Sequence, residues 1–94
     1  SDVVVIDVSK LTVVTDYLVI CHGNSRVHVQ AISEGIEEEL EKQGVNCLRR
    51  EGFEDGRWIV LDYGDAIVHV FRQEERLYYN LERLWSDAPT IEQG

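Results

Sequence analysis

The hydrophobic residues of this chain form continuous runs near its start and in its middle, with one stripe at helical spacing between them. Residues 3–8 and 17–21 are apolar runs rich in β-branched side chains, which predict two buried strands on either side of a polar break. From Ser25 the apolar positions recur every third or fourth residue, which predicts a helix that ends at Gly44. The chain therefore begins with two strands and a helix.

A β-hairpin is the clearest prediction further along the chain. Its two apolar runs, residues 58–61 and 66–71, have hydrophobic side chains on both faces, as strands inside a covered sheet do. The turn between them is polar, and its glycine can take a positive φ. The turn residues, which with Trp58 are the first candidates for a working surface, are Asp62, Tyr63, Gly64 and Asp65.

The remaining segments complete one α/β domain, which is what 94 residues allow. Residues 45–49 predict a short strand, and residues 74–85 predict a final helix through leucines at helical spacing. Pro89 fits a flexible tail over residues 86–94. The order of elements favours a mixed sheet of about five strands, with a crossover helix and a C-terminal helix.

Charge narrows the function more than any other bulk property. Eighteen acidic and nine basic side chains give a net charge of −9, and a nucleic-acid backbone repels such a body. A basic protein surface is therefore favoured as the partner, although acidity that only keeps the domain soluble is the alternative. The sequence has no apolar stretch of membrane-spanning length, so we expect no membrane partner.

Signals for catalysis are weak. The turn Gly23-Asn24-Ser25 before the helix resembles a phosphate-binding entrance, because N–H groups at a helix start can hold an anion. A metal-dependent transferase also needs two carboxylates on one strand, and no such pair follows this turn. Asp62 and Asp65 are the nearest substitute, yet aspartate more often shapes a turn. We therefore expect no enzyme activity and no cofactor.

Cysteine and histidine positions favour structural roles over a metal site. Cys21 and Cys47 lie among apolar residues without CxxC spacing, which favours reduced, buried thiols. Cys21 and its neighbour His22 point to opposite faces of a strand, so they do not form a pair of metal ligands. His69 alternates with apolar residues, as a histidine on a sheet face does. We expect no bound metal ion.

The residues of the polar turn are more typical of a binding surface than of a catalytic site. Trp58 opens a strand after an acidic loop, and Tyr63 lies between Asp62 and Asp65 at the hairpin tip. Aromatic residues of this kind dominate interface energies when a partner buries them. We therefore predict that these four residues bind a basic protein; half-buried packing of Trp58 and a turn role for Tyr63 are the alternatives.

Four motifs, in this order along the chain, resemble the ribosomal silencing factor family, also called the Iojap family. They are Thr15-Asp16-Tyr17, Cys21-His22-Gly23-Asn24-Ser25, the hairpin segment 56–71 and the segment 75–85. The resemblance covers residues 3–88 and implies a compact α/β fold related to nucleotidyltransferases. It also implies a single domain over residues 1–94, which we expect to lack the helix that usually precedes the first strand and so to expose an apolar patch over the sheet.

The resemblance further implies a partner. Ribosomal silencing factors dock on the large ribosomal subunit through protein L-fourteen and prevent its joining with the small subunit, which represses translation without a reaction. Relatives in organelles are tied to large-subunit assembly, which is the alternative, and a nucleotidyltransferase-like nucleotide-binding protein is the less favoured one. From the net charge we expect no direct nucleic-acid specificity, and a homodimer is possible. The resemblance indicates the bacterial cytoplasm, or a mitochondrion or plastid in a eukaryote.

Overall fold

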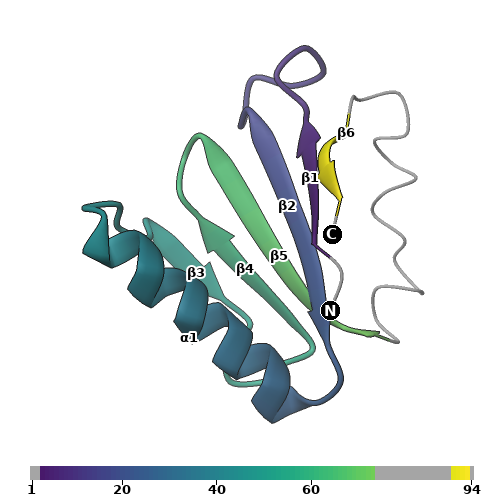
Figure 1. Ribbon diagram of the computed structural model, residues 1–94, viewed down its shortest axis with the longest axis vertical. Helices are drawn as coiled ribbons and strands as arrows, with labels where there is room; N and C mark the ends of the chain where they lie inside the picture. The colour runs from purple at the N-terminus through teal and green to yellow at the C-terminus, as the bar shows by residue number, and fades with distance from the viewer. Residues whose placement is uncertain (1–2, 74–89, 94) are drawn as a thin grey trace.

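A computed structural model describes residues 3–73 and 90–93, which form one six-stranded sheet with a helix packed on one face (Figure 1). The order across the sheet is β3-β4-β5-β2-β1-β6. The elements are β1 (Val4–Asp7), β2 (Tyr17–Gly23), α1 (Arg26–Lys42), β3 (Arg49–Glu51), β4 (Trp58–Asp62), β5 (Ala66–Arg72) and β6 (Thr90–Gln93). The predicted α/β class with a mixed sheet is confirmed.

One parallel strand pair, β2 with β5, makes the described sheet mixed, since the other pairs are antiparallel. Parallel neighbours cannot be joined by a tight turn, and the chain returns from β2 through α1, which is therefore the crossover helix. This topology places the C-terminal ends of β1 and β4 at the same end of the sheet as the N-terminal ends of β2, β3 and β5. Asp7, Asp16, Asp62 and Asp65 lie at this end of the sheet.

The core lies on both faces of the sheet. Along β2, Leu18 and Ile20 pack on the face away from α1, whereas Val19 and Cys21 pack on the face toward α1. This alternation is the two-residue period of a strand. We call the second side the helix face; its buried cluster is Cys21, Val29, Ile59, Leu61, Val68 and Val70. β4 and β5 also contribute side chains to both faces, so the expectation that the two hairpin strands are apolar on both faces is confirmed.

Both ends of α1 are capped, and Gly44 ends the helix as predicted. Ser25 precedes the helix, and its hydroxyl accepts a hydrogen bond from the His28 amide at 3.1 Å. At the other end the Val45 amide donates to the Leu40 carbonyl at 2.8 Å, and Gly44 has a φ of +81°. A residue in the left-handed conformation closes the last helical turn here, and only glycine takes that conformation without steric cost. Local chemistry therefore fixes where α1 begins and ends.

The structure differs from the predicted elements at two places. The strand expected over 45–49 is β3 at Arg49–Glu51, because the Val45 amide is used by the end of α1 and pairing with β4 begins only near Leu48. Residues 90–93, predicted as part of a flexible tail over 86–94, form β6 along the edge of β1. An unpaired strand edge is a template for such pairing. The helix predicted over 74–85 lies outside the described residues.

An apolar groove of about 530 Å³ lies between α1 and the sheet, next to the start of β1. Val3 and Val19 line it from the strands, and Ile32, Ile36 and Leu40 line it from the helix. The groove leaves apolar side chains accessible along one side of α1.

Candidate docking surface

The structure separates Trp58 from the other three predicted binding residues. Trp58 opens β4 and Asp62 ends it, so roughly 13 Å of extended chain lies between them at about 3.3 Å per residue. Tyr63 and Asp65 follow in the turn to β5. Tyr63 therefore lies between the two aspartates as predicted, but Trp58 does not lie with them in one cluster.

Trp58 is half-buried on the face of the sheet opposite α1. Its indole N–H donates to Nδ1 of His69 at 3.0 Å, and its ring stacks on Phe71 with a centroid distance of 5.2 Å. Phe71 lies directly across from Trp58 in the β4–β5 ladder and is fully buried. Trp58 thus has a packing role, which the sequence leaves as the alternative.

His69 accepts the indole hydrogen bond and so must carry no proton on Nδ1. Burial lowers the pKa of its imidazole to about 4, because a charged ring loses solvation among apolar neighbours. The ring lies on the same face as Trp58 and Phe71, with a centroid distance of 6.0 Å to the phenylalanine. The interpretation of His69 as a sheet-face histidine agrees with this geometry.

Tyr63 faces α1 instead of standing free at the hairpin tip. Its ring packs against the helix-face cluster, and its hydroxyl is buried without a hydrogen-bond partner among the described residues. Burial raises the pKa of Tyr63 to about 12. Alternation along the chain explains this placement, since Leu61 already points to the helix face and Tyr63 lies two residues further on. Tyr63 is thus partly buried by its own chain, which fits the turn role that the sequence leaves as the alternative.

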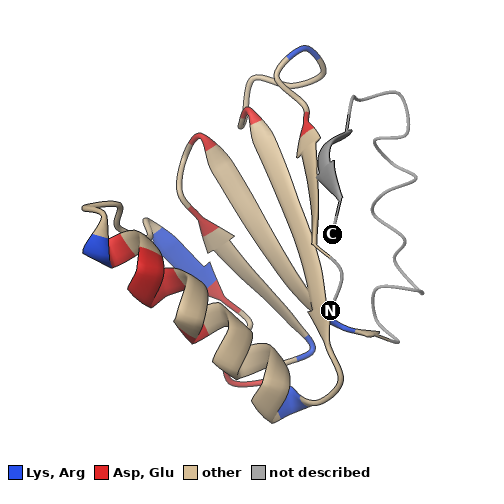
Figure 2. Ribbon diagram, in the orientation of Figure 1, with Lys and Arg blue, Asp and Glu red and all other residues tan. Residues whose placement is uncertain are grey.

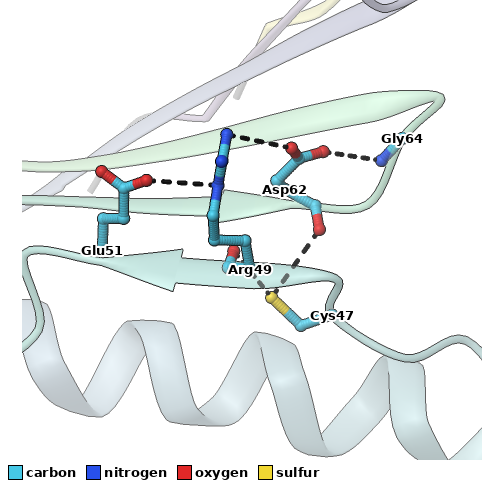
Figure 3. A network of polar contacts seen from close by, with 5 residues as sticks. All are labelled: Cys47, Arg49, Glu51, Asp62 and Gly64. Carbon is cyan, nitrogen blue, oxygen red and sulfur yellow. Dashed lines mark hydrogen bonds and ion pairs between the residues drawn. The ribbon is translucent and has the colours of Figure 1, made fainter.

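Asp62 holds the hairpin turn and the neighbouring strand together (Figure 3). Its carboxylate accepts a hydrogen bond from the Gly64 amide at 2.8 Å and forms an ion pair with Arg49 at 3.8 Å. Arg49 also pairs with Glu51 at 3.2 Å. Gly64 has a φ of +84°, as the turn prediction requires. Asp62 therefore shapes this corner of the sheet.

Asp65 joins the hairpin tip to the start of β2 through its backbone. Its carbonyl accepts hydrogen bonds from the amides of Asp16 and Tyr17 at 2.9 and 3.0 Å. Its side chain is exposed to solvent. Figure 2 shows acidic residues at several strand ends on this end of the sheet, which we call the aspartate edge. It consists of Asp7, Asp16, Asp62 and Asp65.

Sequence reasoning missed the apolar part of the same edge. The pattern over residues 9–16 predicts only a polar break between two strands, yet Leu11, Val13 and Val14 in this loop are exposed. The signal is present in the sequence, because three large apolar residues in eight are unusual for a surface loop. Their periodicity matches no element, so the sequence assigns them no role.

The start of α1 is closed by the chain's own groups. The Ser25 hydroxyl caps the His28 amide, and Nδ1 of His28 accepts a hydrogen bond from the Asn24 amide at 2.9 Å. The imidazole also lies so close to Gly23 that a Cβ there would come within 3.1 Å of it. Two amides of this turn, those of Asn24 and His28, are therefore already used within the chain.

Residues 3–73 and 90–93 show neither a cluster of metal ligands nor a helix suited to cross a membrane. No three histidine, cysteine or acidic side chains in this part gather closely enough to hold a metal ion. Both cysteines are free thiols. Within the same residues, no helix combines the length and the apolar character that crossing a membrane requires.

The described residues define a small α/β domain whose most distinctive surface is a polar strand edge. A family model described as "Ribosomal silencing factor during starvation" matches residues 1–94. The chain therefore belongs to the ribosomal silencing factor family, as its four motifs predict.

Individual relatives agree with this assignment. The chain is 47% identical over 92 residues to the protein named Ribosomal silencing factor RsfS of Halalkalibacterium halodurans, an alignment that covers 98% of this chain and 79% of the relative. It is 32% identical over 92 residues to the chloroplastic protein Iojap of Zea mays, covering 98% of this chain and 40% of that protein. A crystal structure of a Chromobacterium violaceum protein superposes with a TM-score of 0.87 at 34% identity, covering 89% of this chain and 70% of that one.

Proposed function

We propose that this protein docks on the large ribosomal subunit and prevents its joining with the small subunit, so that translation is silenced. The match of the family model to residues 1–94 carries the proposal. Silencing of this kind needs only occupancy of the subunit interface, for which a standard contact of roughly 800 Å² per partner suffices. No reaction has to take place.

The partner that we propose within the large subunit is ribosomal protein L-fourteen, as the family resemblance implies. Electrostatics supports a protein contact over an RNA contact, because the chain carries a net charge of −9 and exposes Asp16 and Asp65 at one edge of its sheet. Attraction to a basic protein surface raises the rate of encounter, whereas phosphates repel such an edge.

The four candidate residues contribute to docking in different ways. Asp65 acts directly through its exposed charge, whereas Trp58 acts by packing on Phe71, which holds β4 against β5 at the far end of the hairpin. Asp62 and Tyr63 act indirectly, because their contacts fix the shape of the hairpin tip. In this proposal the hairpin positions the docking surface and supplies part of its charge.

The mechanism that we propose uses no nucleotide, cofactor or metal ion. The start of α1 supports this, since the amides of Asn24 and His28, which an anion could otherwise use, already donate to the His28 imidazole and the Ser25 hydroxyl. Micromolar nucleotide affinity that disappears in Ser25→Ala would contradict it, because that substitution alters the same helix start.

Assembly of the large subunit is the second candidate function, favoured by the similarity to the chloroplastic protein Iojap. Both functions use the same partner, so the decisive experiment measures subunit joining with finished subunits. Similarity to bacterial and organellar proteins supports action in the bacterial cytoplasm or in an organelle. A homodimer is compatible with either function.

The test mixes purified large and small subunits at moderate salt, with and without the protein, and separates them on a sucrose gradient. We expect the protein to sediment with large subunits and to reduce the amount of joined ribosomes. It should bind neither small subunits nor protein-free ribosomal RNA. Binding to protein-free RNA as strong as to intact large subunits would refute the proposal, whereas binding without any effect on joining would favour the assembly role.

A further inference from the structure

Exposed apolar side chains gather at the aspartate edge. Seven large hydrophobic residues of the described chain are exposed, and all but Val27 lie at this end of the sheet. Val13 is fully exposed, and Val14 and Leu48 are exposed by 72% and 71%. The residues at this end are Leu11, Val13, Val14, Tyr17, Val45 and Leu48.

Backbone hydrogen bonds tie the segments that carry these residues to one another. The amides of Asp16 and Tyr17 bond to the Asp65 carbonyl, and the Leu48 amide donates to the Asp62 carbonyl at 2.8 Å. The β1–β2 loop, the hairpin tip and the segment before β3 are therefore attached to the same strand ends. A surface held in this way loses little conformational entropy when a partner binds.

Clustering of this kind on a small domain indicates an interaction site. Single exposed hydrophobic residues are ordinary, but monomeric proteins rarely group them on one edge unless a partner covers them. Val27, in the first turn of α1 at the opposite end, is the ordinary case. The grouped residues need a partner with an apolar centre.

Charge around the apolar residues selects the kind of partner. Asp16 and Asp65 are exposed, and their carboxylates make no hydrogen bond or ion pair within the described residues. Of the basic residues at this end, Arg49 pairs with Glu51 and Asp62, Lys42 pairs with Glu39, and Lys10 in the β1–β2 loop lies close enough to Asp7 to attract that carboxylate. The rim of the surface is therefore negative. It fits a protein with lysine or arginine side chains around an apolar patch.

The geometry points to the strand-end surface, formed by Val13, Val14, Tyr17, Leu48, Asp16 and Asp65, as the contact with a basic protein of the large subunit. The two valines and Leu48 are its buried anchors, and the two aspartates are its charged rim. This inference rests on the proposed function and deepens it, because it names the anchoring side chains. A second copy of this chain would bring like charges together, and RNA would bring phosphates to the aspartates.

The first experiment compares apolar positions at the two ends of the molecule by affinity for purified large subunits. The double variant Val13→Ser/Val14→Ser and the variant Leu48→Ser remove apolar area that is exposed in the free protein, so folding should be unaffected. The matched control is Val27→Ser, since Val27 is exposed by 73% at the other end of the molecule. We expect the dissociation constant to rise about tenfold or more for the double variant and to stay unchanged for the control.

The second experiment identifies what the surface touches. A photoreactive amino acid at position 13 should crosslink to a basic protein of the large subunit, whereas the same group at position 27 should not. Crosslinking of position 13 mainly to ribosomal RNA, or mainly to a second copy of the chain, would overturn the inference. Sedimentation of the free protein provides an independent reading, because loss of a dimer in Val13→Ser/Val14→Ser would assign the surface to self-association.

The outcomes separate this inference from the proposed function. If the unsubstituted protein binds large subunits and the valine and leucine variants bind equally well, docking stands and the strand-end surface is wrong. If the unsubstituted protein does not bind large subunits at all, both are wrong. Thermal melting of each variant checks that a loss of binding does not come from unfolding.

Discussion

At the scale of single residues, the contact between Trp58 and His69 shows how packing sets the chemistry of a side chain. Only a neutral imidazole can accept the hydrogen bond from the indole N–H. Burial keeps the ring neutral, because it lowers the pKa of His69 to about 4. The hydrogen bond between Trp58 and His69 therefore depends on pH. In the sequence, His69 is marked only by its alternation with apolar residues.

Acid should destabilise the fold through His69. Its folded-state pKa of about 4 lies below the usual 6.5, so the unfolded chain binds more protons between these values and the stabilising contribution, present above pH 6.5, is lost as pH falls toward 4. We expect a decrease of about 1–3 kcal/mol in the free energy of unfolding over this window. Urea unfolding at several pH values measures it. His69→Gln is the control, and an equal decrease in that variant would assign the effect to other groups.

Substitutions of Trp58 should separate its hydrogen bond from its packing. Trp58→Phe keeps a ring to stack on Phe71 and loses the bond to His69, which should cost about 1 kcal/mol of unfolding free energy. Trp58→Ala also removes half-buried area and should cost about 2–3 kcal/mol. Chemical denaturation gives both values. If Trp58→Ala unfolds like the unsubstituted protein while docking is lost, the ring acts in binding alone.

At the scale of elements, backbone conformation at the end of α1 sets the boundary that the sequence predicts. Gly44 ends the helix at a φ of +81°, whereas Gly35 lies inside the helix, where a Cβ would meet no atom within 4 Å. The same residue type therefore has opposite effects at two positions of one segment.

Alanine at these two glycines should change stability in opposite directions. Gly44→Ala forces a side chain into the left-handed region and should lower the free energy of unfolding by about 1 kcal/mol. Gly35→Ala removes backbone freedom from the unfolded chain at an open helical position and should raise it by about 0.5–1 kcal/mol. Melting curves of the two variants, measured side by side, test the pair. Changes of the same sign would mean that the helix end is set by something other than this glycine.

At the scale of the whole molecule, the net charge is −9, and the acidic residues of the described part gather at the strand ends and along α1 (Figure 2). An uneven distribution orients a charged partner during approach as well as attracting it. The charge of the aspartate edge should therefore appear in the rate of association more than in the rate of dissociation.

Asp65→Asn should slow association with the large subunit by about tenfold or less at low salt, and the deficit should shrink as salt screens the charge. The side chain is exposed, and the hydrogen bonds to β2 come from its backbone, so the fold should not change. Glu54→Gln, in the exposed loop at the opposite end, removes the same charge and is the control. Stopped-flow rates across a salt series decide the matter: a deficit that does not vary with salt would exclude an electrostatic role for Asp65.

Elements whose signals are local could be predicted from the sequence alone. The strand over residues 17–21, the capped helix from Ser25 to Gly44 and the hairpin turn at Gly64 follow from side-chain periodicity and backbone preference within a few residues. The net charge and the four family motifs are also properties of the sequence. These features were enough to define the fold class and the family.

Which distant residues meet became visible only in the folded chain. The sequence predicts Tyr63 as a binding residue at the hairpin tip and a polar break between the first two strands. The fold turns Tyr63 toward α1 and brings Val14 to the same end of the sheet as Leu48. It also pairs residues 90–93 with β1. Strand pairing sets these neighbours through hydrogen bonds between segments far apart in the chain, and no local pattern records which strand lies beside which.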